Sequence, residues 1–432
     1  MPRRTAVIAW LTVTAGTGAY LAHALTDPSR RAVYLPGRTT DGHHQIEARC
    51  ETCHTAGEGV TQEACLRCHA GELAEADDSH PPEKFLDPRN ASLVARIDGR
   101  RCVSCHLEHR PGITGEMGVT LARDFCRECH ADIGEERPSH RDLPFDGCQA
   151  TGCHNYHDNR ALGAEFLAEH LDDPPLLSRG TVPARDRPAR DPSARALARE
   201  EADAPASQAD AAAGDEWAAS GHAAAGVNCT GCHGEATWTE RPGPDACAAC
   251  HGAEVDELGS GKHGMRAAAG LAPMRPADAR LPMQEAARHR ELGCSSCHGA
   301  HDADTGHAAV DACLECHADE HSLAYRGSSH AARWQLEQGG AFWAGSGVSC
   351  ATCHMPRVRR VDVARPGVGA RHDQNDALRP PEAMVRPVCM SCHGVGYSLA
   401  ALADRALVHS NFRGAPRGVA EAIEMIRRKE RR

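Results

Sequence analysis

The stretch Asp311-Ala312-Cys313-Leu314-Glu315-Cys316-His317-Ala318 carries the pattern C-x-x-C-H, which recurs along the whole chain. Ten copies have this form, and one more has four residues between its cysteines; together they use all 22 cysteines. In chain order the motifs are Cys50/Cys53/His54, Cys65/Cys68/His69, Cys102/Cys105/His106, Cys126/Cys129/His130, Cys148/Cys153/His154, Cys229/Cys232/His233, Cys247/Cys250/His251, Cys294/Cys297/His298, Cys313/Cys316/His317, Cys350/Cys353/His354 and Cys389/Cys392/His393. The rest of the sequence is spacing between these motifs.

This spacing is the attachment signal for c-type haem. Two thiols on one tight turn can each bond to a vinyl group of the same porphyrin, and the histidine that follows reaches the iron. The longer loop between Cys148 and Cys153 also allows both bonds. Structural zinc and a disulfide framework are the alternatives, but neither requires a histidine directly after every second cysteine. The sequence therefore predicts eleven covalently attached haem c groups.

The composition fits a chain whose core is supplied by a cofactor. The 432 residues include only 6 Phe, 5 Trp and 5 Tyr, so the chain has few large apolar side chains to bury. Porphyrins would replace them, and without haem we expect the chain to be largely unfolded. The net charge of -11 disfavours a nucleic-acid partner and suits basic patches on a redox partner.

The N-terminus has the features of an export segment, which covalent haem attachment outside the cytoplasm requires. Arg3 and Arg4 precede an uncharged, mostly apolar stretch over residues 6–25, and Ala22-His23-Ala24 is a candidate cleavage site. The stretch is also long enough to cross a bilayer. Residues 1–25 are therefore a signal peptide or an uncleaved membrane anchor, and we expect a periplasmic protein, free or tethered to the inner membrane.

An internal repeat organises the chain. Its unit has two motifs and a histidine 10 to 13 residues after the second, and copies lie at about 43–85, 102–145, 222–263 and 289–330. Residues 172–214 are rich in Pro, Ala, Arg and Asp and hold neither Cys nor His, which predicts a flexible linker. The expected division is a five-haem module at 40–171, the linker, a six-haem module at 215–400, and a C-terminal helix with a basic tail at 401–432.

The predicted fold is mostly α with extensive loops and almost no β, with two multihaem modules organised around stacked haems. Helices are expected over residues 161–170 and 329–338. Val419, Ile423 and Ile426 stand at helical spacing and predict an amphipathic helix near the C-terminus. The basic residues 427–432 after it are interpreted as a solvated, frayed end.

The second axial ligands are expected to be histidines. The chain has 28 His, of which eleven belong to the motifs. The candidates fall at repeat positions, in C-H-x-x-H patterns or after the Cys350 motif, and they are His43, His80, His140, His222, His263, His289, His330, His109, His157, His301 and His372. In C-H-x-x-H the second histidine is too close to bind its own haem, so it serves a neighbour. His372 is a candidate for the haem at Cys350 or Cys389.

Some ligand positions stay open. His43 and His44 are adjacent and cannot be separated, and His170, His307, His321 and His409 are weaker candidates. The nine Met share no common offset from the motifs. Methionine ligation would raise the reduction potential, so its absence from the repeat positions favours low-potential iron with two histidine ligands.

The motifs resemble those of multihaem c-type cytochromes. Residues 43–171, with paired C-x-x-C-H, C-H-x-x-H and one C-x4-C-H, resemble the small low-potential class III (cytochrome c3-like) family. Residues 215–432 are similar to the hydroxylamine oxidoreductase-like multihaem superfamily. The residues that carry this likeness are Lys262-His263-Gly264, Ser329-His330-Ala331, Gly347-Val-Ser-Cys-Ala-Thr-Cys-His-Met-Pro356 and Arg371-His372-Asp373. That superfamily includes electron carriers and enzymes, but this chain has no C-x-x-C-K motif.

These observations favour an electron carrier over an enzyme, and no catalytic residue is assigned. The partners implied are a quinol-oxidising membrane complex or periplasmic and outer-membrane cytochromes. The alternative is an oxidoreductase with one open haem in 215–432, acting on hydroxylamine or a small nitrogen or sulphur oxyanion. A further alternative is a structural subunit of a cytochrome filament.

Overall fold

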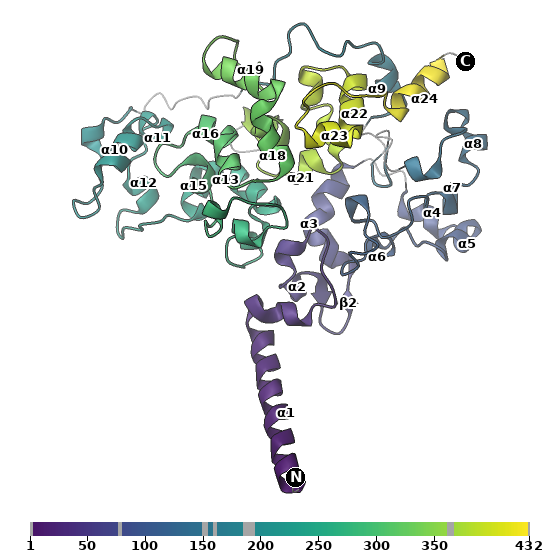
Figure 1. Cartoon of the computed structure of the whole chain (residues 1–432), viewed down its shortest axis with the longest axis horizontal. Helices are drawn as coiled ribbons and strands as arrows, with labels where there is room; N and C mark the ends of the chain where they lie inside the picture. Colours follow the sequence, from purple (N-terminus) through teal and green to yellow (C-terminus); the bar gives the residue numbers. More distant parts are fainter. Residues whose placement is uncertain are drawn as a thin grey trace.

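The structure is a computed structural model that describes residues 3–76, 80–148, 154–158, 162–184, 195–360 and 367–430. Within these ranges the chain forms short helices joined by long loops, with two small antiparallel sheets (Figure 1). The strands are β1 (His54–Thr55) with β2 (Gly59–Val60), and β3 (Arg357–Arg360) with β4 (Gly367–Ala370). The expectation of a mostly α fold with almost no β is confirmed.

The helices of the N-terminal half are α1 (Arg3–Thr26), α2 (Cys50–Cys53), α3 (Gln62–Glu75), α4 (Pro82–Leu86), α5 (Ala91–Val94), α6 (Cys102–Cys105), α7 (Arg127–His130), α8 (Ile133–Glu136) and α9 (Ala164–Glu169). Those of the C-terminal half are α10 (Ala211–Ala218), α11 (Gly221–Ala224), α12 (Thr230–His233), α13 (Pro244–Ser260), α14 (Met265–Ala268), α15 (Ser295–His298), α16 (Thr305–Ala309), α17 (Asp311–Leu314), α18 (Glu320–Ala324), α19 (Ser329–Gln338), α20 (Cys350–His354), α21 (Asn375–Leu378), α22 (Val395–Ala403), α23 (Arg405–His409) and α24 (Glu421–Glu430). The 3₁₀ turns are η1 (Pro28–Tyr34), η2 (His44–Ile46), η3 (Pro88–Asn90), η4 (Glu116–Gly118), η5 (Pro138–His140), η6 (Phe145–Gly147), η7 (Arg199–Glu201), η8 (Pro276–Asp278), η9 (Glu285–Ala287), η10 (Tyr325–Gly327), η11 (Pro381–Met384) and η12 (Cys389–Ser391).

Most attachment motifs form a single helical turn of four or five residues, as in α2, α6, α12 and α20. One turn places residues i and i+3 on the same side, so both cysteines of a motif face one cofactor. Gly234 (φ 88°) and Gly299 (φ 70°) follow the histidines of α12 and α15. A left-handed residue at this place ends a helix, and glycine adopts it without strain. The motif thus forms a short turn that ends at its histidine.

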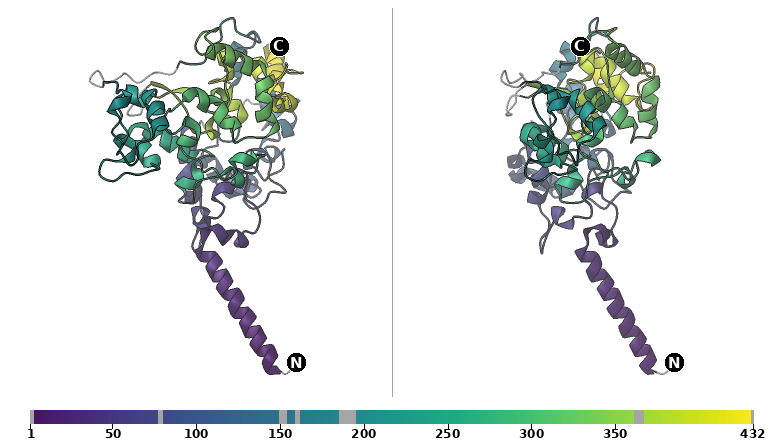
Figure 2. Two further views of the ribbon diagram at one scale, coloured as in Figure 1. Left: turned by 60° about the vertical axis from the view of Figure 1, so that its left-hand side comes forward. Right: turned by 90° about the vertical axis from the view of Figure 1, so that its left-hand side faces the viewer.

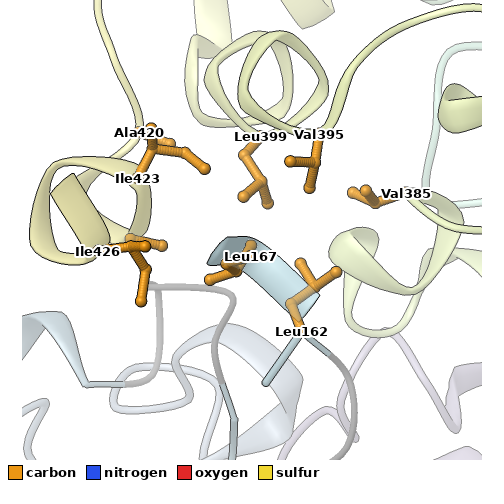
Figure 3. Close-up of a cluster of buried hydrophobic side chains, with 9 residues drawn as sticks. Leu162, Leu167, Val385, Val395, Leu399, Ala420, Ile423 and Ile426 are labelled. Carbon is orange, nitrogen blue, oxygen red and sulfur yellow. The ribbon is translucent and has the colours of Figure 1, made fainter. Parts of the chain in front are cut away.

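The main hydrophobic core lies where the ends of the two halves meet. Leu167 of α9 and Leu162, which precedes this helix, belong to the core. They pack with Leu399 of α22 and with Ile423 and Ile426 of α24 (Figure 3). Ile423 and Ile426 are each only 1% exposed. The amphipathic helix expected near the C-terminus therefore forms, and its apolar face is buried within the protein. Val419, the first residue of the expected apolar stripe, is exposed and precedes α24.

The described parts of the expected linker are hydrogen-bonded to the C-terminal half. The amide of Leu177 donates to the carbonyl of Cys392 at 2.8 Å, and that of Thr181 to Ser391 at 3.0 Å. On the other side, Leu197 N–H donates to Ala223 O at 2.9 Å. Residues 185–194 of the linker lie outside the described residues. The described parts of the predicted linker are therefore held against the C-terminal half.

Helix α1 projects from the rest of the protein, with the first motif near its C-terminal end (Figures 1 and 2). Its segment Arg4–Thr26 is long and apolar enough to cross a membrane and is not buried in the protein. A helix that is apolar on all sides and exposed is typical of a membrane span. Length and composition are also compatible with a signal sequence.

Candidate functional site

Histidines from distant parts of the chain face each other in pairs. Ten pairs have ring centres 5.9–6.3 Å apart, and each joins one motif histidine to one histidine outside the motifs. The pairs are His69–His43, His130–His80, His106–His157, His154–His140, His251–His222, His233–His301, His317–His263, His298–His372, His354–His321 and His393–His330. The fold therefore repeats one arrangement ten times.

The separation fits one metal ion between two imidazoles. A metal–imidazole bond is about 2 Å, and the ring centre lies about 1 Å behind the nitrogen, which gives about 6 Å between centres. Direct stacking of two rings, as between His233 and Trp238 at 4.3 Å, is much closer. With two cysteines beside one member of each pair, the donor set is that of a covalently attached haem with two axial histidines.

Hydrogen bonds to backbone carbonyls orient many of these rings through Nδ1 and leave Nε2 for a metal. The carbonyls accept from Nδ1 of His233 (Thr239 O, 2.7 Å), His393 (Pro175 O, 2.7 Å) and His372 (Ala370 O, 3.1 Å). Such a partner fixes the tautomer in which Nε2 is the free ligand nitrogen.

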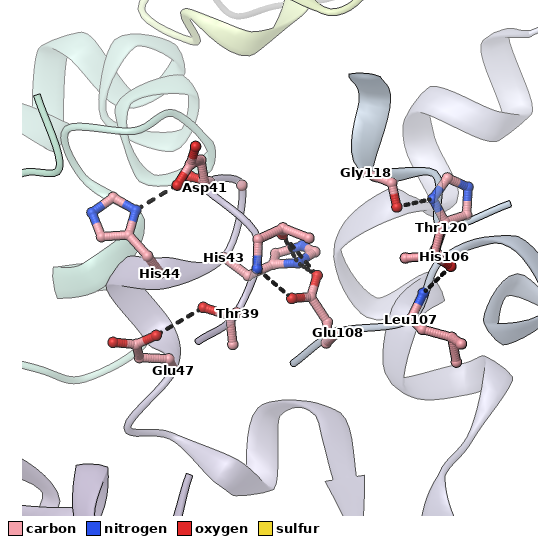
Figure 4. A network of polar contacts seen from close by, with 12 residues as sticks. Thr39, Asp41, His43, His44, Glu47, His106, Leu107, Glu108, Gly118 and Thr120 are labelled. Atoms are coloured by element: carbon pink, nitrogen blue, oxygen red, sulfur yellow. Dashed lines mark hydrogen bonds and ion pairs between the residues drawn. The ribbon is translucent and has the colours of Figure 1, made fainter. Parts of the chain in front are cut away.

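Glu108 orients His43 (Figure 4). Its carboxylate accepts from Nδ1 of His43 at 2.6 Å and from the Thr40 hydroxyl at 2.8 Å. Burial alone would raise the pKa of Glu108, but these hydrogen bonds and that from the Thr40 amide lower it to about 2. The carboxylate thus stays charged and holds the His43 ring toward His69.

Burial keeps several of the paired rings neutral, as metal ligands must be. It lowers the pKa of His263, His330 and His354 to about 4 each, and the facing histidine of each pair adds to the effect. A protonated ring could not bind a metal through that nitrogen. These three sites are therefore set for ligation at neutral pH.

Most of the histidines predicted as second ligands belong to these pairs, and so does one that sequence reasoning ranked low. His157 and His301, each the second histidine of a C-H-x-x-H, face a motif other than their own, as expected. His372 faces His298 of the Cys294 motif, not the motifs at Cys350 or Cys389. His321, rated a weak candidate, faces His354. Its sequence signal is a spacing of four residues after His317, close to that of the C-H-x-x-H histidines.

His54, His109 and His289 belong to none of the ten pairs that the described residues form. His109 donates from Nδ1 to Gly37 O at 2.8 Å, the orientation seen for the paired rings. His289 is exposed. His44 is turned away from His43, and its Nε2 is enclosed by protein atoms without a hydrogen-bond partner (Figure 4). A ligand nitrogen must open onto the space of the porphyrin, so this geometry favours His43 over His44.

Cysteines of successive motifs lie against each other. In four cases the first cysteine of one motif has a raised pKa to which the nearby first cysteine of the next motif contributes, and these are Cys65–Cys102, Cys126–Cys148, Cys247–Cys294 and Cys313–Cys350. A cavity of about 270 Å³ adjoins Cys65. Cys153 lies outside the described residues. The attachment points of neighbouring motifs are therefore adjacent within each half.

Motif cysteines differ in exposure. The exposed ones are Cys50, Cys68, Cys129, Cys232 and Cys250. Cys68 and Cys250 lie within the longer helices α3 and α13. A thioether bond holds only one edge of a porphyrin, so this edge would lie at the surface. Haem attachment at Cys68 and Cys250 stays a prediction.

These two exposed thiols also lie near the preceding motif. The neighbouring Cys68 thiol contributes to the raised pKa of Cys53, and the Cys250 thiol contributes to the raised pKa of Cys232. The second cysteines of the first two motifs therefore approach each other, as do those of the sixth and seventh motifs.

The third and fourth motifs are connected through the histidines that face them. Among the described residues, no cysteine of one of these two motifs lies beside a cysteine of the other. The Tyr156 carbonyl lies 3.0 Å from Nδ1 of His80, which faces the fourth motif. The residue after Tyr156 is His157, which faces His106 of the third motif. The Tyr156 ring also stacks on His80 at 4.2 Å. One peptide unit and one hydrogen bond thus connect the outer ligands of two sites.

The two halves meet beside two of the facing histidines. Lys262 Nζ donates to the carbonyls of Asp41 (2.8 Å) and Gly42 (2.7 Å), and Gln45 Nε2 donates to Lys262 O at 2.5 Å. These contacts join the backbone next to His43 to the backbone next to His263. His43 faces His69 of the second motif, and His263 faces His317 of the ninth. The interface therefore brings the second and ninth motifs together.

The motifs, the mostly helical fold and the facing histidines define a multihaem c-type cytochrome, a protein that transfers electrons through covalently bound haem c. Two comparisons support this class. The cytochrome c3 family profile matches residues 42–131. The chain is also 26% identical to the nine-heme cytochrome c of Desulfovibrio desulfuricans over 275 residues, which are 60% of this chain and 77% of that protein. No solved structure matches the chain. The likeness of residues 215–432 to the hydroxylamine oxidoreductase-like superfamily stays a prediction.

Proposed function

We propose that this chain is a periplasmic cytochrome with eleven haems, all with two axial histidines, that carries electrons between respiratory redox partners. The observation that carries the proposal is the set of ten facing histidine pairs, each beside a cysteine pair. Haem supplies the one-electron chemistry, while the chain sets ligands, spacing and burial. A site with both axial positions filled leaves no room for substrate, which favours a carrier over an enzyme.

The repeat identifies the partner of the unpaired motif histidine His54. In the C-terminal half, the histidine that follows the third motif of the module, His301, faces His233 of the first motif. The equivalent residues of the N-terminal half are His109 and His54. His109 already has its Nδ1 bonded to a backbone carbonyl. We therefore assign His109 as the second ligand of the first haem.

The contacts between motifs suggest the route of the electrons. Adjacent cysteines connect neighbouring sites within each half, and the Tyr156 carbonyl bridges the ligands of the third and fourth sites. The halves exchange electrons where His43 and His263 flank the Lys262 contacts. Net charge of -11 favours partners with basic docking surfaces. The partner classes proposed are a quinol-oxidising membrane complex and other periplasmic or outer-membrane cytochromes.

The haem count is tested by the mass of the mature, exported protein. We expect a mass that exceeds that of the polypeptide by eleven haem groups, because all 22 cysteines belong to motifs. Ten haems, with both Cys148 and Cys153 free to react with a thiol reagent, would show that the longer motif does not attach haem. A mass without haem would contradict the proposal.

Carbon monoxide tests the ligation. Because CO binds only to reduced haem with an open position, the fully reduced wild-type protein is expected to bind none. His109→Ala should open one haem per molecule, and the matched variant His44→Ala should open none. The absorbance change on CO addition to the dithionite-reduced protein measures this. CO binding by the wild-type protein would favour the alternative, an oxidoreductase with one open haem in residues 215–432.

A further inference from the structure

The turn that follows α1 ties the first attachment motif to the end of this helix. η1 folds back along α1, and the Tyr34 hydroxyl donates to Leu21 O at 2.6 Å. Arg31 Nε donates to Leu25 O at 2.9 Å, and its Nη1 to Glu51 Oε2 at 2.8 Å. Glu51 lies between the two cysteines of the first motif. One arginine thus joins the helix end to the loop that holds the first haem.

The same side of the protein exposes apolar side chains around that motif. Val33 and Tyr34 of η1 are 52% and 38% exposed, and Val60 of β2 is 40% exposed. Cys50 and His54 are exposed as well. Exposed valines beside a tyrosine at the end of an apolar helix match the composition of a membrane–water interface.

The length and charges of α1 set the orientation. Its apolar segment has 23 residues, of which Ala24 near the C-terminal end is buried while the rest of the segment stands clear of the protein, and this length suffices to span the bilayer core. Arg3 and Arg4 at its start favour a cytoplasmic N-terminus. The C-terminal end of α1, and with it η1 and α2, then emerges at the outer surface of that membrane. Figure 1 shows α24 and its basic end far from α1.

We propose that the surface formed by η1, α2 and the β1–β2 turn rests on the phospholipid bilayer that α1 spans. The first attachment motif is then the point where a membrane-embedded redox partner exchanges electrons with the chain. The electron-exchange step rests on the proposed function, whereas the placement on lipid does not. Within this placement Arg31 is a positioning residue, because it holds the loop of the first motif against the helix end.

The test maps lipid contacts on the full-length, haem-loaded protein in phospholipid vesicles that contain a lipid with a photoreactive headgroup. Mass spectrometry of the cross-linked peptides is expected to find most cross-links within residues 28–60. Arg31→Glu should reduce them severalfold, and the double variant R31E/E51R should restore them in part. The visible spectrum of each variant checks that its haems are retained and ligated.

A matched control is available at another motif. Arg96 forms an exposed ion pair with Glu128 at 3.0 Å, and Glu128 lies inside the fourth motif as Glu51 lies inside the first. Arg96→Glu should leave the cross-links unchanged. Cross-links spread evenly or centred on residues 421–432, an unchanged pattern in R31E, or a mature protein that lacks residues 1–25 would each overturn the proposal. A low haem count would instead overturn the proposed function and leave this placement standing.

Discussion

Without attached haem, the chain is expected to lose most of its helical structure. Its buried apolar residues form small separate clusters, and the largest gathers nine residues around Leu167 and Ile423. Most motif helices are single turns, which are not stable alone because nucleation of a helix is costly. Covalent haem closes each turn and supplies apolar surface, so its binding energy is part of the folding energy.

The measurement is far-ultraviolet circular dichroism of the exported protein from cells with and without the haem-attachment machinery. The haem-free chain should show a weak helical signal and no cooperative melting transition, while the loaded protein shows both. A haem-free protein that melts cooperatively with near-native helix content would contradict the idea that haem supplies the core.

Removal of one haem at a time should lower the melting temperature more where the attachment site is more buried. Cys389 packs against the cluster that contains the buried Val388 and Met384, whereas Cys50 is exposed. Replacing both cysteines of the Cys389 motif by serine should therefore lower the melting temperature more than the same change at the Cys50 motif. Equal losses at both motifs would indicate that attachment, and not burial of the porphyrin, carries the stability.

The motifs could be predicted from the sequence because their chemistry is local. Two cysteines and a histidine within five residues define a haem turn whatever surrounds them, and the predicted helix over residues 329–338 forms as α19. The interfaces could not be predicted, because they depend on backbone groups. The linker composition suggested a free tether, but amides of Leu177 and Thr181 bond to distant carbonyls, and every sequence carries such amides.

The exposure of individual motif cysteines was not predictable either. Cys68 and Cys250 carry the same local pattern as the buried Cys316, yet both are exposed. The motif fixes how two thiols lie relative to one histidine, whereas burial depends on which distant segment packs over the turn. Sequence spacing therefore locates an attachment point without placing it inside or outside the core.

The pairing of histidines was only partly predictable, because it also depends on which distant segments pack together. Spacing after a motif shows which histidines are too close to bind their own haem, and this holds for His157 and His301. It does not show which distant motif a histidine will face. His298 and His372 are far apart in sequence, and His372 is held in place by Glu257 of α13 and Ala370 of β4.

His321 and His289 separate the structure-based assignment from the sequence-based one. His321 is half-buried, donates from Nδ1 to Val408 O at 2.5 Å, and faces His354 at 6.1 Å. His289 occupies a repeat position but is exposed and faces no other imidazole among the described residues. We therefore propose His321 as the second ligand of a haem at the tenth motif, and ligation by His289 stays an untested prediction.

Replacing His321 by methionine should change a reduction potential, whereas the same replacement at His289 should not. A thioether ligand stabilises reduced iron, so His321→Met should raise the reduction potential of one haem by a value on the order of 0.1–0.3 V. His289→Met should leave every potential unchanged, because no ligand is exchanged. Spectroelectrochemical titration resolves the result as one component of the curve that moves to higher potential. A shift in H289M, or none in H321M, would show that the repeat position outweighs the observed packing and that the tenth site is ligated differently.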